Sequence, residues 1–103
     1  MAESNSSWVL YMIRCGDGSL YTGITTDAER RLREHEDTNG QGRGAKFLRG
    51  KQPLQLVYKI AVPNRSSALQ MEYALKQLSK SEKESLVRNE NTLLELLNRK
   101  NTE

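Results

Sequence analysis

The segment from Trp8 to Ile24 predicts a β-hairpin, and the rest of the fold has to be built around it. Residues Trp8 to Arg14 (WVLYMIR) are apolar and β-prone, and Leu20 to Ile24 (LYTGI) have the same character. Between them stands Cys15-Gly-Asp-Gly-Ser19, a glycine-rich segment that is typical of a tight turn. The chain therefore opens with two antiparallel strands.

The length of this turn decides whether Tyr11 and Tyr21 share a face of the sheet. A two-residue turn at Asp17-Gly18 would put the two rings on opposite faces. A three-residue loop with Gly18 in the left-handed conformation would put both rings on one face. The sequence suits both turns, and tyrosine is common in strands for packing reasons alone. If the two phenols act together, the loop must have three residues.

The rest of the chain predicts one further strand and several helices. In residues 54–62 every second side chain is large and apolar, which indicates a third strand closed by Pro63. Four segments have helix-capping patterns, and they are Thr26-Asp-Ala-Glu29, Ser67-Ala-Leu-Gln70, Ser81-Glu-Lys-Glu84 and Thr92-Leu-Leu-Glu95. The first helix is expected to reach about Asp37 and the second about Ser79. The order β-β-α-β-α-α predicts an α+β fold with a small three-stranded, mainly antiparallel sheet flanked by helices.

A length of 103 residues is enough for one small domain. We expect a disordered N-terminus over residues 1–7, a main domain over 8–80, and a helical extension over 81–103 that packs on the same domain. In that extension Leu93, Leu94, Leu96 and Leu97 are too crowded for all of them to face one small core. Either the helix packs on its own domain or it forms a dimer contact, so we expect a monomer or a weak dimer.

Composition excludes several classes of protein. No apolar run approaches the roughly 20 residues of a membrane span, and the polar segment Met1 to Ser7 does not resemble a signal peptide. One cysteine cannot form an internal disulfide, and with one histidine the chain lacks a Cys/His zinc set. We therefore expect a soluble cytoplasmic protein without a membrane partner.

The net charge of +3 is distributed unevenly along the chain. No acidic residue occurs between Asp37 and Glu72, whereas this stretch contains Arg43, Lys46, Arg49, Lys51, Lys59 and Arg65. The glycine-rich loop at 39–51 is a candidate clamp for a nucleic acid backbone, with Arg43, Lys46, Arg49 and Lys51 as its phosphate-binding residues. The alternative is a basic loop that is simply solvated.

Helical geometry selects three candidates for chemistry. His35 lies in the middle of the inward-facing stripe of the first helix, and Arg31 borders that stripe. A histidine in this position is usually a hydrogen-bonded core residue, but a half-buried arginine needs an anionic partner. Glu72 lies at the rim of the buried face of the second helix. It either forms an exposed pair with Lys76 or holds a hard cation such as Mg²⁺.

Taken together, these residues resemble the GIY-YIG nuclease superfamily, in particular its short, single-domain bacterial YhbQ-like branch. Val9-Leu10-Tyr11 and Tyr21-Thr22-Gly23 stand at the two motifs that name the family, with Gly23 as the motif glycine. The segment from Gly23 to His35 is similar to the one that carries the family's arginine and histidine. Residues 68–76 resemble the helix that carries its acidic metal ligand. The likeness covers about residues 8–80.

The resemblance implies an endonuclease that hydrolyses DNA phosphodiester bonds with one divalent cation, Mg²⁺ or Mn²⁺. It also implies selectivity for DNA structure, a link to DNA repair or processing, and RNA as an alternative substrate. Tyr11 would deprotonate or hold the attacking water with help from Tyr21, and Arg31 would bind the scissile phosphate. Glu72 would hold the metal, and His35 would assist in the same cluster.

This sequence departs from the family pattern in some respects. Val9 and Leu10 replace the first glycine and isoleucine, and Ile24 stands where some branches have lysine. Asn89 is the candidate for the late asparagine that many members carry. The chain shows no separate DNA-recognition domain, so the DNA target is the weakest part of the likeness. The rival hypotheses are a non-catalytic nucleic-acid-binding module and an interaction domain that works through its C-terminal helix.

Overall fold

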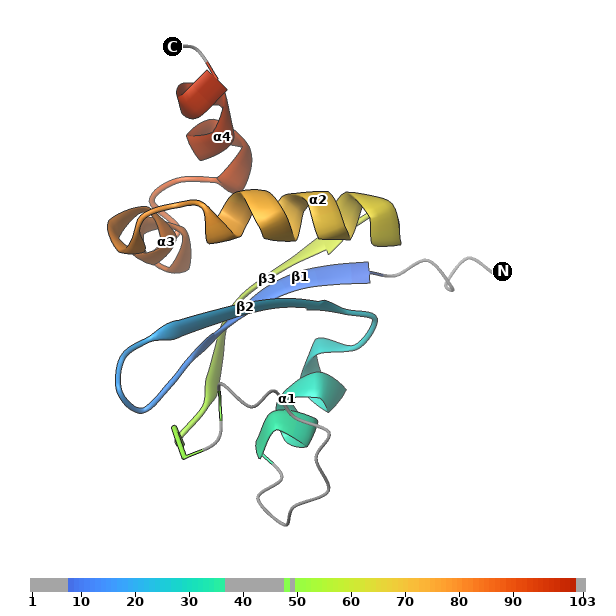
Figure 1. The fold of residues 1–103 in the computed structure, drawn as a ribbon, viewed down its shortest axis with the longest axis vertical. Helices are drawn as coiled ribbons and strands as arrows, with labels where there is room; N and C mark the ends of the chain where they lie inside the picture. Colours follow the sequence, from blue (N-terminus) through green and yellow to red (C-terminus); the bar gives the residue numbers. More distant parts are fainter. Residues whose placement is uncertain (1–7, 37–47, 49, 102–103) are drawn as a thin grey trace.

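A three-stranded sheet with helices on both faces forms the molecule. The computed structural model describes residues 8–36, 48 and 50–101. In chain order the elements are β1 (Trp8–Arg14), β2 (Leu20–Thr25), α1 (Ala28–Glu36), β3 (Gln55–Val62), α2 (Arg65–Lys76), α3 (Lys80–Val87) and α4 (Leu93–Asn101). The strands pair antiparallel in the order β2-β1-β3. Figure 1 shows α1 on one face of the sheet and α2, α3 and α4 on the other. The predicted α+β fold is confirmed.

The hairpin loop between β1 and β2 has three residues. The amide of Cys15 donates to the carbonyl of Ser19 at 2.9 Å, and the amide of Gly18 donates to the carbonyl of Cys15, also at 2.9 Å. Gly18 has φ 89°, the left-handed conformation that the longer loop requires. In the resulting register Tyr11 pairs with Gly23 and Ile13 pairs with Tyr21. The two phenols therefore lie on the same face of the sheet.

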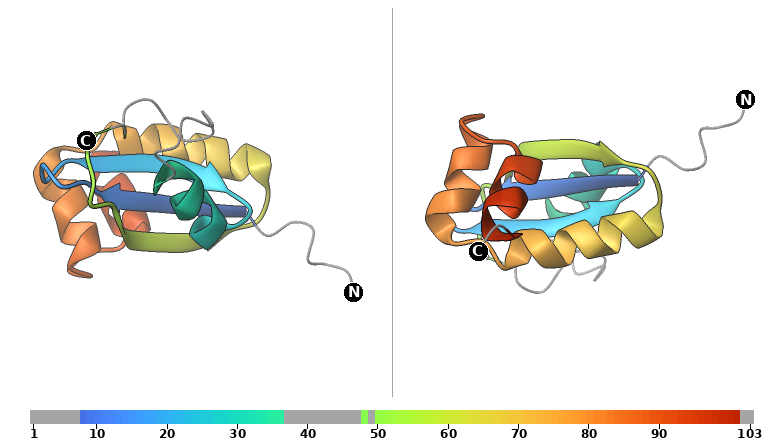
Figure 2. Two further views of the ribbon diagram at one scale, coloured as in Figure 1. Left: turned by 90° about the horizontal axis from the view of Figure 1, so that it is seen from below. Right: turned by 90° about the horizontal axis from the view of Figure 1, so that it is seen from above.

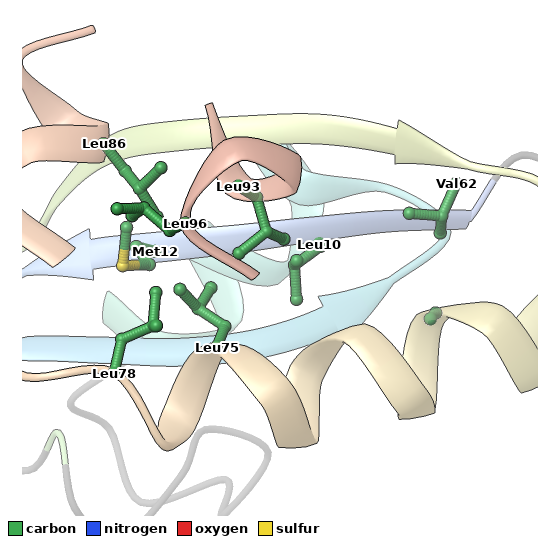
Figure 3. Packing of buried hydrophobic residues seen from close by; sticks show 9 residues of the cluster. Leu10, Met12, Val62, Leu75, Leu78, Leu86, Leu93 and Leu96 are labelled. Carbon is green, nitrogen blue, oxygen red and sulfur yellow. The ribbon is translucent and has the colours of Figure 1, made fainter. Parts of the chain in front are cut away.

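The two faces of the sheet carry separate hydrophobic clusters. On the face of α2, α3 and α4, Leu10 and Met12 pack with leucines from the helices. Figure 3 shows Leu75 of α2 and Leu96 of α4 pointing into this cluster. The α1 face has a smaller cluster made of Tyr11, Ile13, Cys15, Leu48 and Leu54. Since successive residues of a strand point to opposite faces, β1 supplies the large core on one side and a tyrosine on the other.

Three helices begin at residues other than the predicted ones. Asp27, not Thr26, caps α1 by accepting a hydrogen bond from the amide of Arg30 at 3.0 Å. Asn64 caps α2, so this helix starts before Ser67, and it ends at Lys76 rather than near Ser79. Ser79 forms the capping box of α3 with Glu82, two residues before the predicted box. In α2 and α3 the capping residue has extended backbone, a geometry that a sequence pattern does not reveal.

The predicted start of the last helix is confirmed. The amide of Thr92 donates to the carboxylate of Glu95 at 2.9 Å, and the amide of Glu95 donates to the hydroxyl of Thr92 at 3.1 Å. Within α4, Leu93 and Leu96 are buried in the large core, whereas Leu94 is exposed. Leu97 is partly buried against the same core, so the leucine-rich helix packs on its own domain through three of the four crowded leucines.

An ion pair fastens α3 to the end of β1. Nη2 of Arg14 donates to Oε1 of Glu84 at 2.6 Å, and Nη1 donates to Oε2 of the same carboxylate. Lys80, one turn before Glu84, donates to the carbonyl of Gly18 in the hairpin loop at 2.7 Å. These contacts hold the pKa of Glu84 down at about 2, chiefly through the hydrogen bond from Arg14.

Replacing Glu84 by glutamine is expected to destabilise the protein at neutral pH but not in strong acid. A depressed carboxyl pKa contributes stability above the ordinary value of 4.5, and this contribution disappears as the pH falls towards 2. Glu84→Gln should therefore lower the free energy of unfolding by about 1 kcal/mol at pH 7, with a deficit that shrinks between pH 4.5 and 2. Urea titrations across that range measure the effect. Glu90→Gln, which breaks an exposed pair with Arg88, is the control, and a deficit of equal size at both pH limits contradicts the prediction.

Candidate active site

Tyr11 lies at the centre of the candidate site. It is on the middle strand, and only 1% of its surface is exposed. Its hydroxyl lies over Gly23, its partner on β2, where a Cβ atom would come within 2.5 Å of the phenol oxygen. Such an approach is closer than any real Cβ contact. Gly23 is therefore required at this position so that the phenol can lie across the neighbouring strand.

His35 and Tyr21 complete an aromatic cluster around this phenol. Asp27 caps α1, and Ala28 and His35, two turns apart, are its buried residues. The hydroxyl of Tyr11 lies 3.1 Å from Nε2 of His35. The ring centroid of Tyr21 lies 5.4 Å from that of His35, with the rings edge to face, and 6.5 Å from that of Tyr11. The structure thus brings together three residues that lie far apart in the sequence.

The environment fixes which of these groups carries a proton. Burial raises the pKa of Tyr11 to about 12, and the nearby Tyr21 contributes to the rise. Burial, with the positive charge of Arg31, lowers the pKa of His35 to about 4. At neutral pH the phenol is therefore protonated and the imidazole is neutral. In the tautomer of His35 that carries its ring proton on Nδ1, Tyr11 donates the hydrogen bond and Nε2 of His35 accepts it.

Arg31 lies one turn before His35 on α1 and is half-buried. Nη1 of Arg31 donates to Oε1 of Glu34 at 2.8 Å, which supplies the anionic partner that a half-buried guanidinium needs. The charge of Arg31 lowers the pKa of Tyr11 as well as that of His35. The guanidinium therefore acts on both members of the hydrogen-bonded pair.

Glu72 approaches this cluster from a different element. Figure 2 shows α2 lying alongside β2, at the edge of the sheet away from β3. The side chain of Glu72 is 20% exposed, and Oε2 lies 3.4 Å from Nζ of Lys76. The pair with Lys76 that the sequence suggested is therefore present. The negative charge of Glu72 also contributes to the raised pKa of Tyr11, so the carboxylate acts on the same site as Arg31.

The donor set of the site suits a hard divalent cation. In the described part of the chain, no group of three or more His, Cys, Asp or Glu residues is placed to hold a metal ion. This arrangement does not fit zinc, which takes three or four protein ligands. Mg²⁺ is often held by one or two carboxylates, and water and substrate phosphate supply the other ligands. A single half-buried carboxylate such as that of Glu72 fits this mode of binding.

The predicted nucleic-acid clamp lies mostly outside the described residues. Arg43, Lys46 and Arg49 fall in the parts that the structure does not describe, as do residues 1–7. Lys51 is described, and its Nζ forms an ion pair at 3.0 Å with Asp17 of the hairpin loop. Leu48, which the sequence did not single out, is completely buried in the cluster that contains Tyr11. The end of this loop is therefore anchored beside the candidate site.

Asn89 lies on the face of the sheet opposite to Tyr11. It lines a pocket with Tyr58 and Ile60, which belong to the core on the α2–α4 side of the sheet. Its φ of 61° and the bond from the amide of Glu90 to the carbonyl of Ser85 form a Schellman motif that ends α3. Asn89 is thus a helix-terminating residue, and its role as the late active-site asparagine stays a prediction.

Lys59 is a charged residue of the α1 face that sequence reasoning did not place near the site. It pairs with Tyr11 across β1 and β3, so the two side chains leave the sheet on the same face. Its Nζ donates to Oε2 of Glu29 on α1 at 2.9 Å. The register of the third strand relative to the first would have found it, but that register depends on a bulge between Met12 and Ile13.

Comparison with known proteins gives one family and several relatives. The family model described as the GIY-YIG catalytic domain matches residues 7–85, a range that contains every described residue of the candidate site. The UPF0213 protein YhbQ of Escherichia coli O127:H6 is 53% identical over 91 residues, which cover 88% of this chain and 87% of that protein. A UPF0213 protein of Vibrio cholerae serotype O1 is 51% identical over 88 residues, 84% of this chain and 83% of the relative.

Two solved structures have a similar fold. The solution NMR structure of a UPF0213 protein from Bacillus halodurans has a TM-score of 0.51 and 41% sequence identity, and the match covers 84% of this chain and 87% of that one. The solution NMR structure of a protein from E. faecalis has a TM-score of 0.55 and 36% identity, with 85% and 90% covered. Among the described helices, none is long and apolar enough to cross a membrane.

Proposed function

Because this chain belongs to the GIY-YIG catalytic domain family, a family of nucleases, we propose that it is an endonuclease that hydrolyses DNA phosphodiester bonds with Mg²⁺ or Mn²⁺. The observation that carries the proposal is the hydrogen bond between Tyr11 and His35. It joins a proton donor to a neutral base, and Arg31 and Glu72 act on the same phenol. A domain that only binds nucleic acid has no evident need for this combination.

The pKa values favour a proton relay through Tyr11 to His35. Forming a free Tyr11 phenolate at pH 7 against a pKa of about 12 costs about 7 kcal/mol. Protonating His35 against a pKa of about 4 costs about 4 kcal/mol. The cheaper route is one in which the phenol oxygen takes a proton from the attacking water while its own proton passes to Nε2 of His35. The anionic phosphate of the substrate would lower the second cost further.

The other residues of the cluster bind and orient the substrate. Arg31 would bind the scissile phosphate and stabilise the charge that develops on it, a role for which a preorganised guanidinium is well suited. Tyr21, packed edge to face on His35, would hold the imidazole in place and help to position the attacking water. Arg43, Lys46, Arg49 and Lys51 remain proposed contacts to the DNA backbone.

Glu72 would hold the divalent cation. When bound, the cation would neutralise charge on the phosphate and on the leaving oxygen. Lys76 lies within reach of the same carboxylate and balances its charge when no cation is present. We also propose that the activity serves DNA repair or processing and selects DNA by its structure, with RNA as an alternative substrate.

A cleavage assay with matched variants tests the proposal. Wild type should cleave one or more of single-stranded, flapped, branched and duplex DNA when Mg²⁺ or Mn²⁺ is supplied, and EDTA should stop the reaction. Glu72→Gln, which keeps the shape of the side chain and removes its charge, should reduce the rate by about 10²-fold. Glu95→Gln on α4, far from the cluster, is the control. Wild type that is no faster than Glu72→Gln on all four substrates would overturn the proposal.

The alternative, a non-catalytic nucleic-acid-binding module, predicts a different result. DNA or RNA binding would then be sensitive to salt, would survive Glu72→Gln, and would fall when Arg43, Lys46 and Arg49 are neutralised. Binding of this kind without metal-dependent cleavage would establish the alternative.

A further inference from the structure

The outer face of α2 carries large apolar side chains that pack against no core. Tyr73 is 70% exposed and Leu69 is 40% exposed. Together with Leu94 of α4 they are the large hydrophobic residues that stand out on the described surface. Leu69 and Tyr73 are four residues apart, one turn of the helix, so they are neighbours. A role in the core explains neither of them.

This apolar pair is connected to the proposed metal ligand through its neighbours on the helix. Leu69 lies three residues before Glu72 and Lys76 lies four residues after it, so both adjoin the carboxylate. Tyr73 adjoins Leu69 and Lys76 in the same way and lies further round the helix from Glu72. Lys76 is half-exposed and carries a positive charge beside the carboxylate. Arg65, at the start of the helix, lies over the ring of Trp8. The apolar pair therefore lies between two cations along α2, with Arg65 four residues before Leu69 and Lys76 three residues after Tyr73.

We propose that Leu69 and Tyr73 form a stacking surface for an unpaired nucleobase that lies next to the phosphate bound near Glu72. The inference rests on the proposed nuclease function and names two further residues that determine its specificity. An exposed aromatic ring among cations is how proteins bind unpaired bases, because every base has a face that can stack. Lys76 would contact the phosphate that adjoins the stacked base.

The position of the stacking surface explains what it adds to the site. The proposed cluster around Tyr11 would bind a phosphate, and the phosphate group is the same whether its base is paired or unpaired. A duplex keeps its bases within the helix, so Tyr73 gains a partner only where a base is unstacked. Tyr73 would thus favour substrates with unpaired bases at the cleavage point.

Binding measurements without cleavage test the inference. The full chain is titrated, in EDTA, into a fluorescently labelled single strand of about 20 nucleotides and into the matching duplex, and anisotropy is recorded. Tyr73→Ala should weaken single-strand binding about tenfold and duplex binding less than about twofold. Tyr73→Phe should bind like wild type, since the stacking ring is retained. Leu94→Ala, which removes an apolar residue with 68% exposure on α4, is the matched control.

An abasic substitution identifies the base that is contacted. A single abasic nucleotide is moved along the strand, and at one position wild type should bind as weakly as Tyr73→Ala, while the variant loses nothing more. Equal losses on single strand and duplex, or no loss on either, overturn the stacking surface. A change in the sedimentation of Tyr73→Ala without a change in its DNA binding also overturns the proposal, because this face of α2 would then be a contact between copies of the chain. Because EDTA prevents cleavage, these results do not depend on whether the nuclease assay succeeds.

Discussion

Tyr11→Phe is expected to reduce the rate of DNA cleavage about 10³-fold while leaving the fold unchanged. Phenylalanine keeps the ring that fills the buried position on β1 and removes only the hydroxyl that lies 3.1 Å from Nε2 of His35. The proton of the attacking water then has no route to the imidazole. Single-turnover cleavage with Mg²⁺ measures the loss, and far-UV circular dichroism and the unfolding midpoint show that the variant is folded.

A double mutant separates the relay from two independent roles. His35→Gln keeps a side chain that can hydrogen-bond to the phenol but does not accept a proton at neutral pH. If Tyr11 and His35 act as one unit, the double variant should be about as slow as the slower single variant. Multiplicative losses would show that the two residues act separately, and the relay would then be wrong.

The pH profile of the wild type gives a second view of the same relay. His35 has to be neutral to accept a proton, and its pKa of about 4 lies well below the ordinary value of 6.5. The value of kcat/KM should therefore remain level as the pH falls through 6.5 and drop only as it approaches 4, since this parameter reports the free enzyme. A fall centred on 6.5 would mean that His35, the one histidine of the chain, does not have the lowered pKa on which the relay depends.

The sequence predicted which strands and helices form better than it predicted the residues at which the helices begin and end. Alternation and glycine-rich turns located all three strands, because these signals are local. The caps of α1, α2 and α3 were predicted wrongly by a few residues, since Asp27, Asn64 and Ser79 compete with neighbouring polar residues for the same role. The backbone conformation decides which of these polar residues caps the helix, and a short sequence pattern does not determine that conformation.

For the candidate site, the sequence could suggest which residues to consider, but it could not predict which of them contact one another. Helical periodicity placed His35 on the buried stripe of its helix, and the structure has it buried. Whether Tyr11 and Tyr21 share a face of the sheet depended on one residue in a loop, and the left-handed Gly18 shows that they do. The place of Lys59 beside Tyr11 was not predicted, because cross-strand pairing cannot be known without the register. The helix-terminating conformation of Asn89 could not be predicted, because the sequence alone does not distinguish an asparagine that ends a helix from any other.

Gly23→Ala is expected to reduce both stability and cleavage, although glycine itself does no chemistry. A Cβ here would lie 2.5 Å from the phenol oxygen of Tyr11 and 2.7 Å from the carbon that bears it. The ring has to shift, and the surrounding core is closely packed, so unfolding should become easier by about 2 kcal/mol. A displaced hydroxyl loses its geometry towards His35, which should slow cleavage about 10²-fold. Urea unfolding and single-turnover cleavage of the folded variant measure the two effects.

A second glycine of the hairpin separates this steric effect from a general cost of replacing glycine. Gly18 has a left-handed backbone but nothing within 4 Å of its Cβ position, so Gly18→Ala should cost about 1 kcal/mol of stability through strain and leave cleavage by the folded protein unchanged. Adding Tyr11→Phe to Gly23→Ala removes the atom that clashes most and should restore part of the lost stability without restoring activity. If Gly23→Ala cleaves as fast as Gly18→Ala, the close approach of Tyr11 to Gly23 does not position the phenol, because the site then tolerates a shift of its central residue.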